Sequence, residues 1–145
     1  MADSAPLRLV VFRVGDLTCA APASIVREIL PALPATRIPG VAKAVEGLVN
    51  VRGALLTVVD GHAILGRARG ADDEGAIMMI GLGERLCGLV VSQVLDFLEV
   101  PSSAIAPHDE LPGVDPRLAK AVGRWADYHF VLLDLDTLLA PLLGS

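Results

Sequence analysis

Arg52 is the residue of this 145-residue chain whose type and setting best fit a chemical task. It stands beside Gly53 at the start of an apolar run, Ala54–Asp60, that is typical of a buried strand. A guanidinium group offers a planar fork of donors that binds a carboxylate at two points, and it keeps its charge at physiological pH. The setting therefore predicts a recognition residue on a rigid support, not an acid or a base.

The serines and glycines give no sign of catalysis. Ser24, Ser102 and Ser103 have no base close by in the sequence, and no nucleophile-elbow motif occurs. The run Gly81-Leu82-Gly83 leads into a strand pattern, whereas a dinucleotide-binding loop must lead into a helix. We therefore expect no catalytic residues and no cofactor.

The histidines, at positions 62, 108 and 129, are scattered. His108-Asp109-Glu110 has the residue types of a metal site, but only when it is taken in isolation. We therefore expect no metal. A small metal-dependent enzyme and a ligand-binding β-barrel module are the alternatives from other classes.

The composition of the chain limits the kinds of partner that it can bind and the cell compartment in which it is expected. The net charge is −5 without a cluster of Lys and Arg, and aromatics make up 3%, so nucleic-acid binding is not expected. Apolar residues make up 53%, but their runs are short compared with the roughly 20 residues that span a bilayer. The first residues lack the pattern of a secretory signal. We expect a cytoplasmic protein without direct membrane insertion.

The chain repeats its own strand pattern at a shift of about 68 positions. Leu9–Val14 and Leu17–Ala21 flank a Gly15-Asp16 turn, and a third strand pattern follows at Ile25–Leu30. The same order returns in Ile77–Leu82, Arg85–Leu89 and Gln93–Leu98. Cys19 aligns with Cys87, and we expect both to be buried, unpaired thiols.

The ends of the two repeats correspond at a shift of about 74. Leu56–Asp60 parallels Phe130–Asp134, and each aspartate is placed to cap a following helical turn. At this shift Arg52 aligns with Ala126, so the arginine is an addition that the repeated scaffold does not need.

The duplication predicts two related β-units, each a small, partly closed barrel, within a single domain of residues 1–145. We place the first unit at residues 7–66 and the second at residues 76–140. Between them, Gly66–Gly75 should form an exposed hairpin or linker. Val41–Glu46 is expected to form a short helical turn.

Taken together, the segments resemble a known family in their order and spacing over nearly the whole chain. These segments are Val10–Asp16, Val26–Ile29, Ile38–Gly40, Glu46–Gly53, Val58–Asp60, Gly83–Val91 and Val131–Asp136. They resemble the CheW-like domain of bacterial chemotaxis coupling proteins.

The resemblance implies a mainly β fold of two pseudo-symmetric, five-stranded SH3-like barrels packed together, with short helices. It also implies a non-catalytic adaptor that links the cytoplasmic tips of methyl-accepting chemoreceptors to the regulatory domain of a CheA-type histidine kinase. A chemotaxis-like pathway with another output, such as pili or development, stays open. Val26, Glu28 and Arg52 are the implied receptor-facing residues. Asn50 belongs to the same motif, where ordering the turn is its expected task.

Arg52 and Glu28 also leave an alternative open, since they could pair with each other on the surface.

Two stretches depart from the family pattern. Gly61-His62 replaces a leucine and an arginine that many relatives carry, which is expected to weaken a strand end. Residues 122–129 replace a glycine-rich approach to the last strand, which is expected to alter one partner surface.

Overall fold

The computed structural model describes residues 5–71, 73–107 and 119–143. They form two β-sheets with short helices between and after the strands. The five-stranded sheet contains β3 (Val26–Pro31), β4 (Val45–Val51), β5 (Ala54–Asp60), β6 (Ala76–Leu82) and β7 (Arg85–Val91). The six-stranded sheet contains β1 (Leu7–Val14), β2 (Leu17–Pro22), β8 (Gln93–Val100), β9 (Ile105–Pro107), β10 (Ala119–Trp125) and β11 (Tyr128–Leu133). The helices are η1 (Ala23–Ile25), α1 (Gly61–Leu65), η2 (Ser102–Ala104), α2 (Leu135–Leu139) and η3 (Ala140–Leu142).

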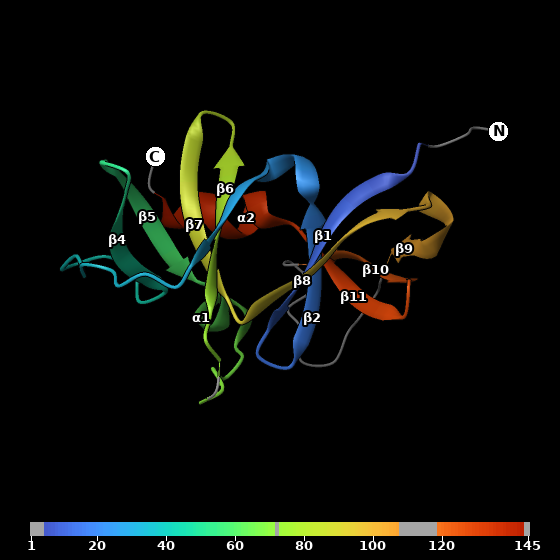
Figure 1. The fold of residues 1–145 in the computed structure, drawn as a ribbon, viewed down its shortest axis with the longest axis horizontal. Coiled ribbons are helices and arrows are strands. Elements are labelled where there is room, and N and C mark those ends of the chain that lie inside the picture. Colours follow the sequence, from blue (N-terminus) through green and yellow to red (C-terminus); the bar gives the residue numbers. More distant parts are fainter. Residues whose placement is uncertain (1–4, 72, 108–118, 144–145) are drawn as a thin grey trace.

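The two sheets lie side by side and have the same strand arrangement (Figure 1). The order β3-β6-β7-β5-β4 corresponds strand for strand to β8-β1-β2-β11-β10, and β9 extends the second sheet by one short strand. In each sheet one parallel pair joins two hairpins, β5 with β7 and β11 with β2. The predicted mainly β fold with two pseudo-symmetric SH3-like barrels is confirmed.

The barrels do not coincide with the predicted halves, residues 7–66 and 76–140. The strands of the five-stranded barrel follow one another in the chain between Val26 and Val91, whereas the strands of the six-stranded barrel come from residues 7–22, 93–107 and 119–133. A two-stranded hairpin such as β1–β2 leaves both of its edges open. Local sequence pattern predicts the hairpin, but distant packing decides which strands complete the sheet.

The repeat itself reappears in the elements. β4 and β10 each carry a bulge directly after their first residue pair with the following strand, between Val45 and Gly47 and between Ala119 and Ala121, and each hairpin leads into a short helix. Both helices begin as predicted with an aspartate cap: Asp60 accepts the His62 N–H at 3.0 Å, and Asp134 accepts the Thr137 N–H at 3.3 Å.

The core has one part inside each barrel and a third part between them. Val49, Leu56 and Ile77 fill the five-stranded barrel, and Leu9, Val11 and Phe130 fill the other. The part between the barrels includes both cysteines and the apolar side of α2, which crosses behind β6 and β7 (Figure 1). Burial raises the pKa of Cys19 to about 12 and that of Cys87 to about 11, so both are inert, unpaired thiols as predicted.

Two loop expectations need correction. Val41–Glu46 forms no helical turn, because the turns there give way to β4 at Val45. Gly66–Gly75 is no simple exposed linker either, since the side chain of Asp73 is only 10% exposed and accepts hydrogen bonds from Arg13 on β1 and from Ser92 between β7 and β8. Among the described residues, no helix is long and apolar enough to cross a membrane.

Candidate partner-binding site

The β4–β5 turn places Arg52 at the tip of a hairpin. Arg52 and Gly53 have φ values of 51° and 88°, the left-handed pair that a tight two-residue hairpin turn requires. The Asn50 side-chain oxygen accepts the Gly53 N–H at 2.9 Å, so Asn50 orders the turn as expected. This short turn restricts the backbone at Arg52 and so fixes the point from which its side chain extends.

Arg52 and Glu28 form a two-point ion pair. Arg52 Nη1 donates to Glu28 Oε2 at 3.0 Å, and Nη2 donates to Oε1 at 2.6 Å. Hydrogen bonding from Arg52 lowers the pKa of Glu28, against a smaller opposing effect of burial, and hydrogen bonding to Glu28 raises the pKa of Arg52. The pairing that the sequence left open is therefore present.

This ion pair spans the seam of the five-stranded barrel. Its strands β3 and β4 are the two edges of the sheet, and the sheet must curl for Glu28 to reach the β4–β5 turn. Beside them Thr36 and Leu48 exchange two backbone hydrogen bonds of 2.8 Å. A Cβ on Gly47, where φ is 142°, would clash with the Thr36 carbonyl group, so the closure depends on a glycine there.

The four predicted partner-binding residues lie along this seam. Arg52 and Glu28 expose 67% and 36% of their side chains. Asn50 is exposed next to the turn, and Val26 is half-buried on β3, where it packs against the core between the barrels. A bulge separates Val26 from Glu28 in the pairing of β3 with β6. The structure thus brings Glu28, Asn50 and Arg52 together at the seam, whereas the side chain of Val26 faces the junction of the barrels.

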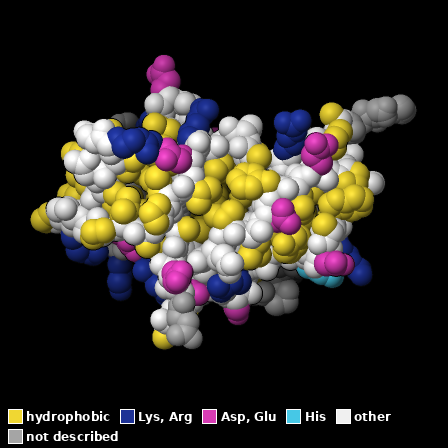
Figure 2. Space-filling model, in the orientation of Figure 1, with side chains coloured by type: hydrophobic (Ala, Val, Ile, Leu, Met, Phe, Trp, Pro, Cys, Tyr) yellow, Lys and Arg dark blue, Asp and Glu magenta, His cyan; other side chains and the backbone are white. Residues whose placement is uncertain are grey.

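Apolar side chains gather across the middle of the face that carries β3 and β8, with charged side chains around them (Figure 2). Ile29 on β3 is 37% exposed and Phe97 on β8 is 56% exposed. Between these strands a hollow of about 460 Å³ is lined by Ile29, Val94 and the polar side chains of Arg13 and Asp73. Exposed apolar surface of this kind, rimmed by charge, is typical of protein recognition.

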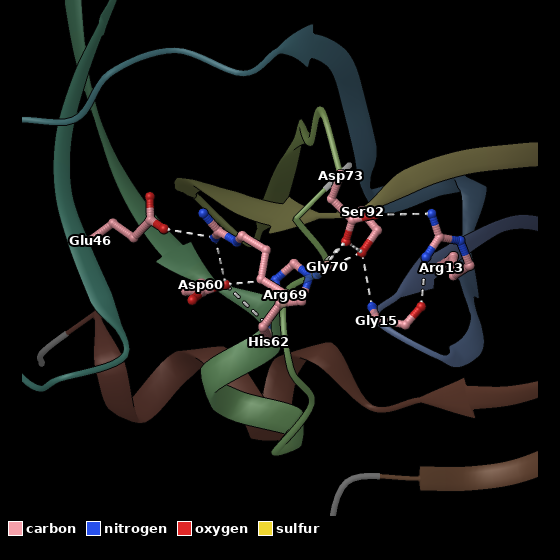
Figure 3. A network of polar contacts seen from close by, with 9 residues as sticks. All are labelled: Arg13, Gly15, Glu46, Asp60, His62, Arg69, Gly70, Asp73 and Ser92. Atoms are coloured by element: carbon pink, nitrogen blue, oxygen red, sulfur yellow. Dashed lines mark hydrogen bonds and ion pairs between the residues drawn. The ribbon is translucent and has the colours of Figure 1, made fainter.

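Sequence reasoning missed a polar network at the junction of the barrels (Figure 3). His62 is 3% exposed, and its Nδ1 lies 2.9 Å from Asp60 Oδ1 and its Nε2 2.9 Å from Ser92 Oγ. His62 lies beyond the strand end that it was expected to weaken, because it follows the Asp60 cap and belongs to the first turn of α1. Nothing in the sequence marks Ser92 or Asp73 as its neighbours, since they come from a strand crossover and a loop.

The order Ser92, His62, Asp60 resembles a hydrolytic triad, but the serine is not placed to act as a nucleophile. Ser92 is 5% exposed, and its hydroxyl accepts the Gly15 N–H at 2.9 Å and donates to Asp73 Oδ2 at 2.8 Å. A nucleophile needs an exposed oxygen whose proton passes to the base. The network is therefore structural.

Three arginines extend this network across the junction. Arg13 on β1 donates to Asp73 Oδ1 at 3.3 Å, and Arg67 donates to Asp16 Oδ1 at 3.3 Å. Arg69 donates to Asp60 and to Glu46, each at 3.0 Å. Burial raises the pKa of Asp60, but hydrogen bonds from His62 and Arg69 and the charge of Arg69 outweigh it and lower the pKa overall. The segment with Arg67, Arg69 and Asp73 is thereby fastened to both barrels.

The metal-like run His108-Asp109-Glu110 lies outside the described residues. Within them, no group of three His, Cys, Asp or Glu side chains is arranged to hold a metal ion.

Two SH3-like barrels that carry an exposed ion pair and an apolar face define a module for protein recognition. The chain belongs to the CheW-like domain family, whose model matches residues 8–142. It is 36% identical over 104 residues to the chemotaxis protein CheW of Rhizobium meliloti, covering 71% of this chain and 67% of that protein. It is 30% identical over 135 residues to a probable chemotaxis protein CheW of Rhizobium etli, covering 91% and 86%.

A solved structure supports the fold. The scaffolding protein TtCheW of Thermoanaerobacter tengcongensis superposes with a TM-score of 0.83 at 22% identity, covering 92% of each chain. The predicted family and the role of a chemotaxis coupling adaptor are confirmed. At the level of the family these proteins are scaffolds and adaptors, not enzymes.

Proposed function

We propose that this chain couples chemoreceptor tips to the regulatory domain of a CheA-type histidine kinase in the cytoplasm, without catalysis of its own. The receptor-facing surface is formed by Val26, Glu28, Asn50 and Arg52. A receptor tip is a helical hairpin, and a helix with one apolar side fits an apolar surface whose charged margin selects its register.

The equivalent turn of the other barrel is the observation that carries the proposal. Ala126 and Asp127 have φ values of 51° and 67°, so they form the same kind of turn as Arg52 and Gly53. That turn has no arginine. The guanidinium is therefore not needed to build the hairpin, and its exposed position favours a role in recognition.

The Glu28–Arg52 pair gives the partner a preorganised pattern of charge. Each side chain holds the other in place, so a bound helix orders fewer rotamers than it would on two mobile side chains. Arg52 still presents N–H groups that point away from Glu28, because a guanidinium has five donors and the ion pair uses one from each terminal nitrogen.

Arg52→Ala tests the proposal. The expected result is a melting temperature close to that of the wild type together with at least a tenfold loss of binding to a receptor tip fragment. Arg124→Ala, on β10, removes the same charge near the equivalent turn and should bind like the wild type. If Arg52→Ala unfolds, or if both variants bind equally well, the assignment of Arg52 fails.

The charge-reversed double variant, Glu28→Arg with Arg52→Glu, distinguishes the need for an ion pair between these two residues from direct contact of their charges with the receptor. It preserves the ion pair across the seam, so the fold should survive. If the partner reads the charges directly, the reversed pair will not restore receptor binding. Full binding by the double variant would show that only the pairing matters.

The kinase is tested separately. A pull-down from the native lysate should retain a CheA-type kinase with the wild type and also with Arg52→Ala. Loss of the kinase with Arg52→Ala would mean that the seam contacts the kinase and not the receptor.

A further inference from the structure

The hydrogen bonds around His62 determine how many protons its ring carries. Ser92 Oγ accepts the Gly15 N–H at 2.9 Å and donates to Asp73 Oδ2 at 2.8 Å. A hydroxyl group has a single proton, so Ser92 has none left for His62 Nε2, which lies 2.9 Å from the same oxygen. His62 must therefore be the donor at Nε2.

The other ring nitrogen faces a carboxylate. Nδ1 lies 2.9 Å from Asp60 Oδ1. The same oxygen accepts a hydrogen bond from Arg69 and another from the His62 backbone N–H, each at 3.0 Å, and these two bonds hold the carboxylate in its ionised form. An ionised carboxylate only accepts hydrogen bonds. His62 must also be the donor at Nδ1, and a ring that donates at both nitrogens is an imidazolium.

The surrounding charges suit a buried cation. Asp60 from β5 touches one side of the ring, and Asp73 Oδ2 from the 66–75 segment lies 3.9 Å from Nε2 on the other. The further charged groups of the network are Glu46 on β4, Arg13 on β1, and Arg67 and Arg69 on the 66–75 segment. The arginines are paired with Asp73, Asp16, Glu46 and Asp60, so their charges are largely offset.

We propose that His62, when both of its ring nitrogens are protonated, holds the 66–75 segment and the β1–β2 turn to the five-stranded barrel. With both protons it joins Asp60 to Ser92, and Ser92 in turn holds Gly15 and Asp73. A neutral ring has one N–H group, so it leaves a lone pair facing either the Asp60 carboxylate or the Ser92 oxygen. Either choice loosens the junction and reshapes the hollow that Arg13, Asp73 and Ser92 line.

The sign of the pH dependence follows. Both ring contacts need their own proton, so removal of either proton by raising the pH breaks one of the two hydrogen bonds. Hydrogen bonds lower the pKa of both Asp60 and Asp73 in the folded protein, so their stabilisation is lost only as the pH falls into the acid range. The junction is tightest between these two limits.

Nitrogen-15 NMR of the imidazole rings tests the proposal on the unaltered protein. Both ring nitrogens of His62 should show the shifts of protonated nitrogens at about pH 6, where a solvated histidine is already partly neutral. His129, exposed on β11, is the internal reference. A neutral His62 ring with an unprotonated Nε2 at this pH overturns the proposal.

Amide hydrogen exchange tests the consequence. After correction for intrinsic exchange, protection of the Gly15 and Gly70 N–H groups should fall roughly tenfold between about pH 6 and pH 9 in the wild type. His62→Gln should show no such fall, and His129→Gln should follow the wild type. A fall that persists in His62→Gln would contradict the role of this ring.

Discussion

At the seam of the five-stranded barrel, Arg52 reaches from the β4–β5 turn to Glu28 on β3, and at the corresponding seam Tyr128 donates its hydroxyl to Asp96 on β8 at 3.4 Å. Asp96 occupies the position that the repeat assigns to Glu28. The five-stranded barrel closes with a charged pair on its surface, whereas the six-stranded barrel uses an aromatic ring that packs on its core. One scaffold thus closes in two ways, and only one of them leaves a pair of opposite charges on the outside.

A second difference lies next to each seam. In the five-stranded barrel a single bridge between Thr36 and Leu48 covers the edge of β4, and in the other barrel the whole of β9 pairs with β10. Gly47 and Ala121 are the equivalent residues directly after each bulge. The loop presses on β4 closely enough to require a glycine, but β9 leaves room for a methyl group.

Gly47→Ala should have the largest effect on this comparison. The added Cβ meets the Thr36 carbonyl group at a backbone φ of 142°, so we expect a loss of about 3 kcal/mol in the free energy of unfolding. Ala121→Gly is the matched change and should cost about 1 kcal/mol or less. Urea unfolding of both variants provides the measurement. Equal losses would mean that the two edges are not constrained differently.

Replacement of the capping aspartate should also destabilise the protein more at Asp60, which follows β5, than at Asp134, which follows β11. Asp60→Asn removes the charge that faces both His62 and Arg69, and we expect a loss of about 2 kcal/mol, against about 1 kcal/mol for Asp134→Asn. Both carboxyls have a lowered pKa in the folded protein, so the stabilisation is lost as the pH falls below about 4. Thermal melts from neutral to acid pH should show a shallower decline for Asp60→Asn. A decline as steep as that of the wild type would count against Asp60 as the main acid-sensitive group.

Asn50→Ala removes the acceptor for the Gly53 N–H, and the expected loss is about 1 kcal/mol. Arg124 is the equivalent residue before the β10–β11 turn, and its replacement by alanine should change stability by less than about 0.5 kcal/mol. Chemical denaturation distinguishes the two. If they match, the Asn50 side chain does not order its turn.

The smallest effects are expected at the second turn positions. Gly53→Ala adds a Cβ that meets no atom within 4 Å, so its cost of about 1 kcal/mol comes from the positive φ alone. Asp127→Gly should relieve the corresponding strain and stabilise by less than about 1 kcal/mol. Differential scanning calorimetry should show melting temperatures that shift in opposite directions.

Much of the fold follows from short-range signals. Alternating apolar residues and glycine turns predict the hairpins, and the aspartates at positions 60 and 134 predict the helix starts. The distribution of strands between the barrels does not follow from them. β1 pairs with β8 across most of the chain, and the choice between β8 and β3 depends on packing that no local pattern records.

The candidate site divides in the same way. Arg52 and Asn50 belong to one turn, so their neighbourhood follows from the sequence, and Glu28 follows from the family resemblance. Asp73 shows the opposite case. It belongs to an acidic run that is typical of a solvated loop, yet its carboxylate receives hydrogen bonds from Arg13, Gly70 and Ser92. Only the three-dimensional arrangement shows that this carboxylate has partners.

The continuous five-stranded barrel interrupts the other one, and this has a consequence for synthesis on the ribosome. The β1–β2 hairpin emerges before the strands of the five-stranded barrel, but its neighbours β8 and β11 emerge only after them. Residues 26–91 have every strand of their own sheet by then, so we expect them to fold while the hairpin waits. During that interval the hairpin carries two open edges and an apolar face, and it is the part of the nascent chain that a chaperone is expected to bind.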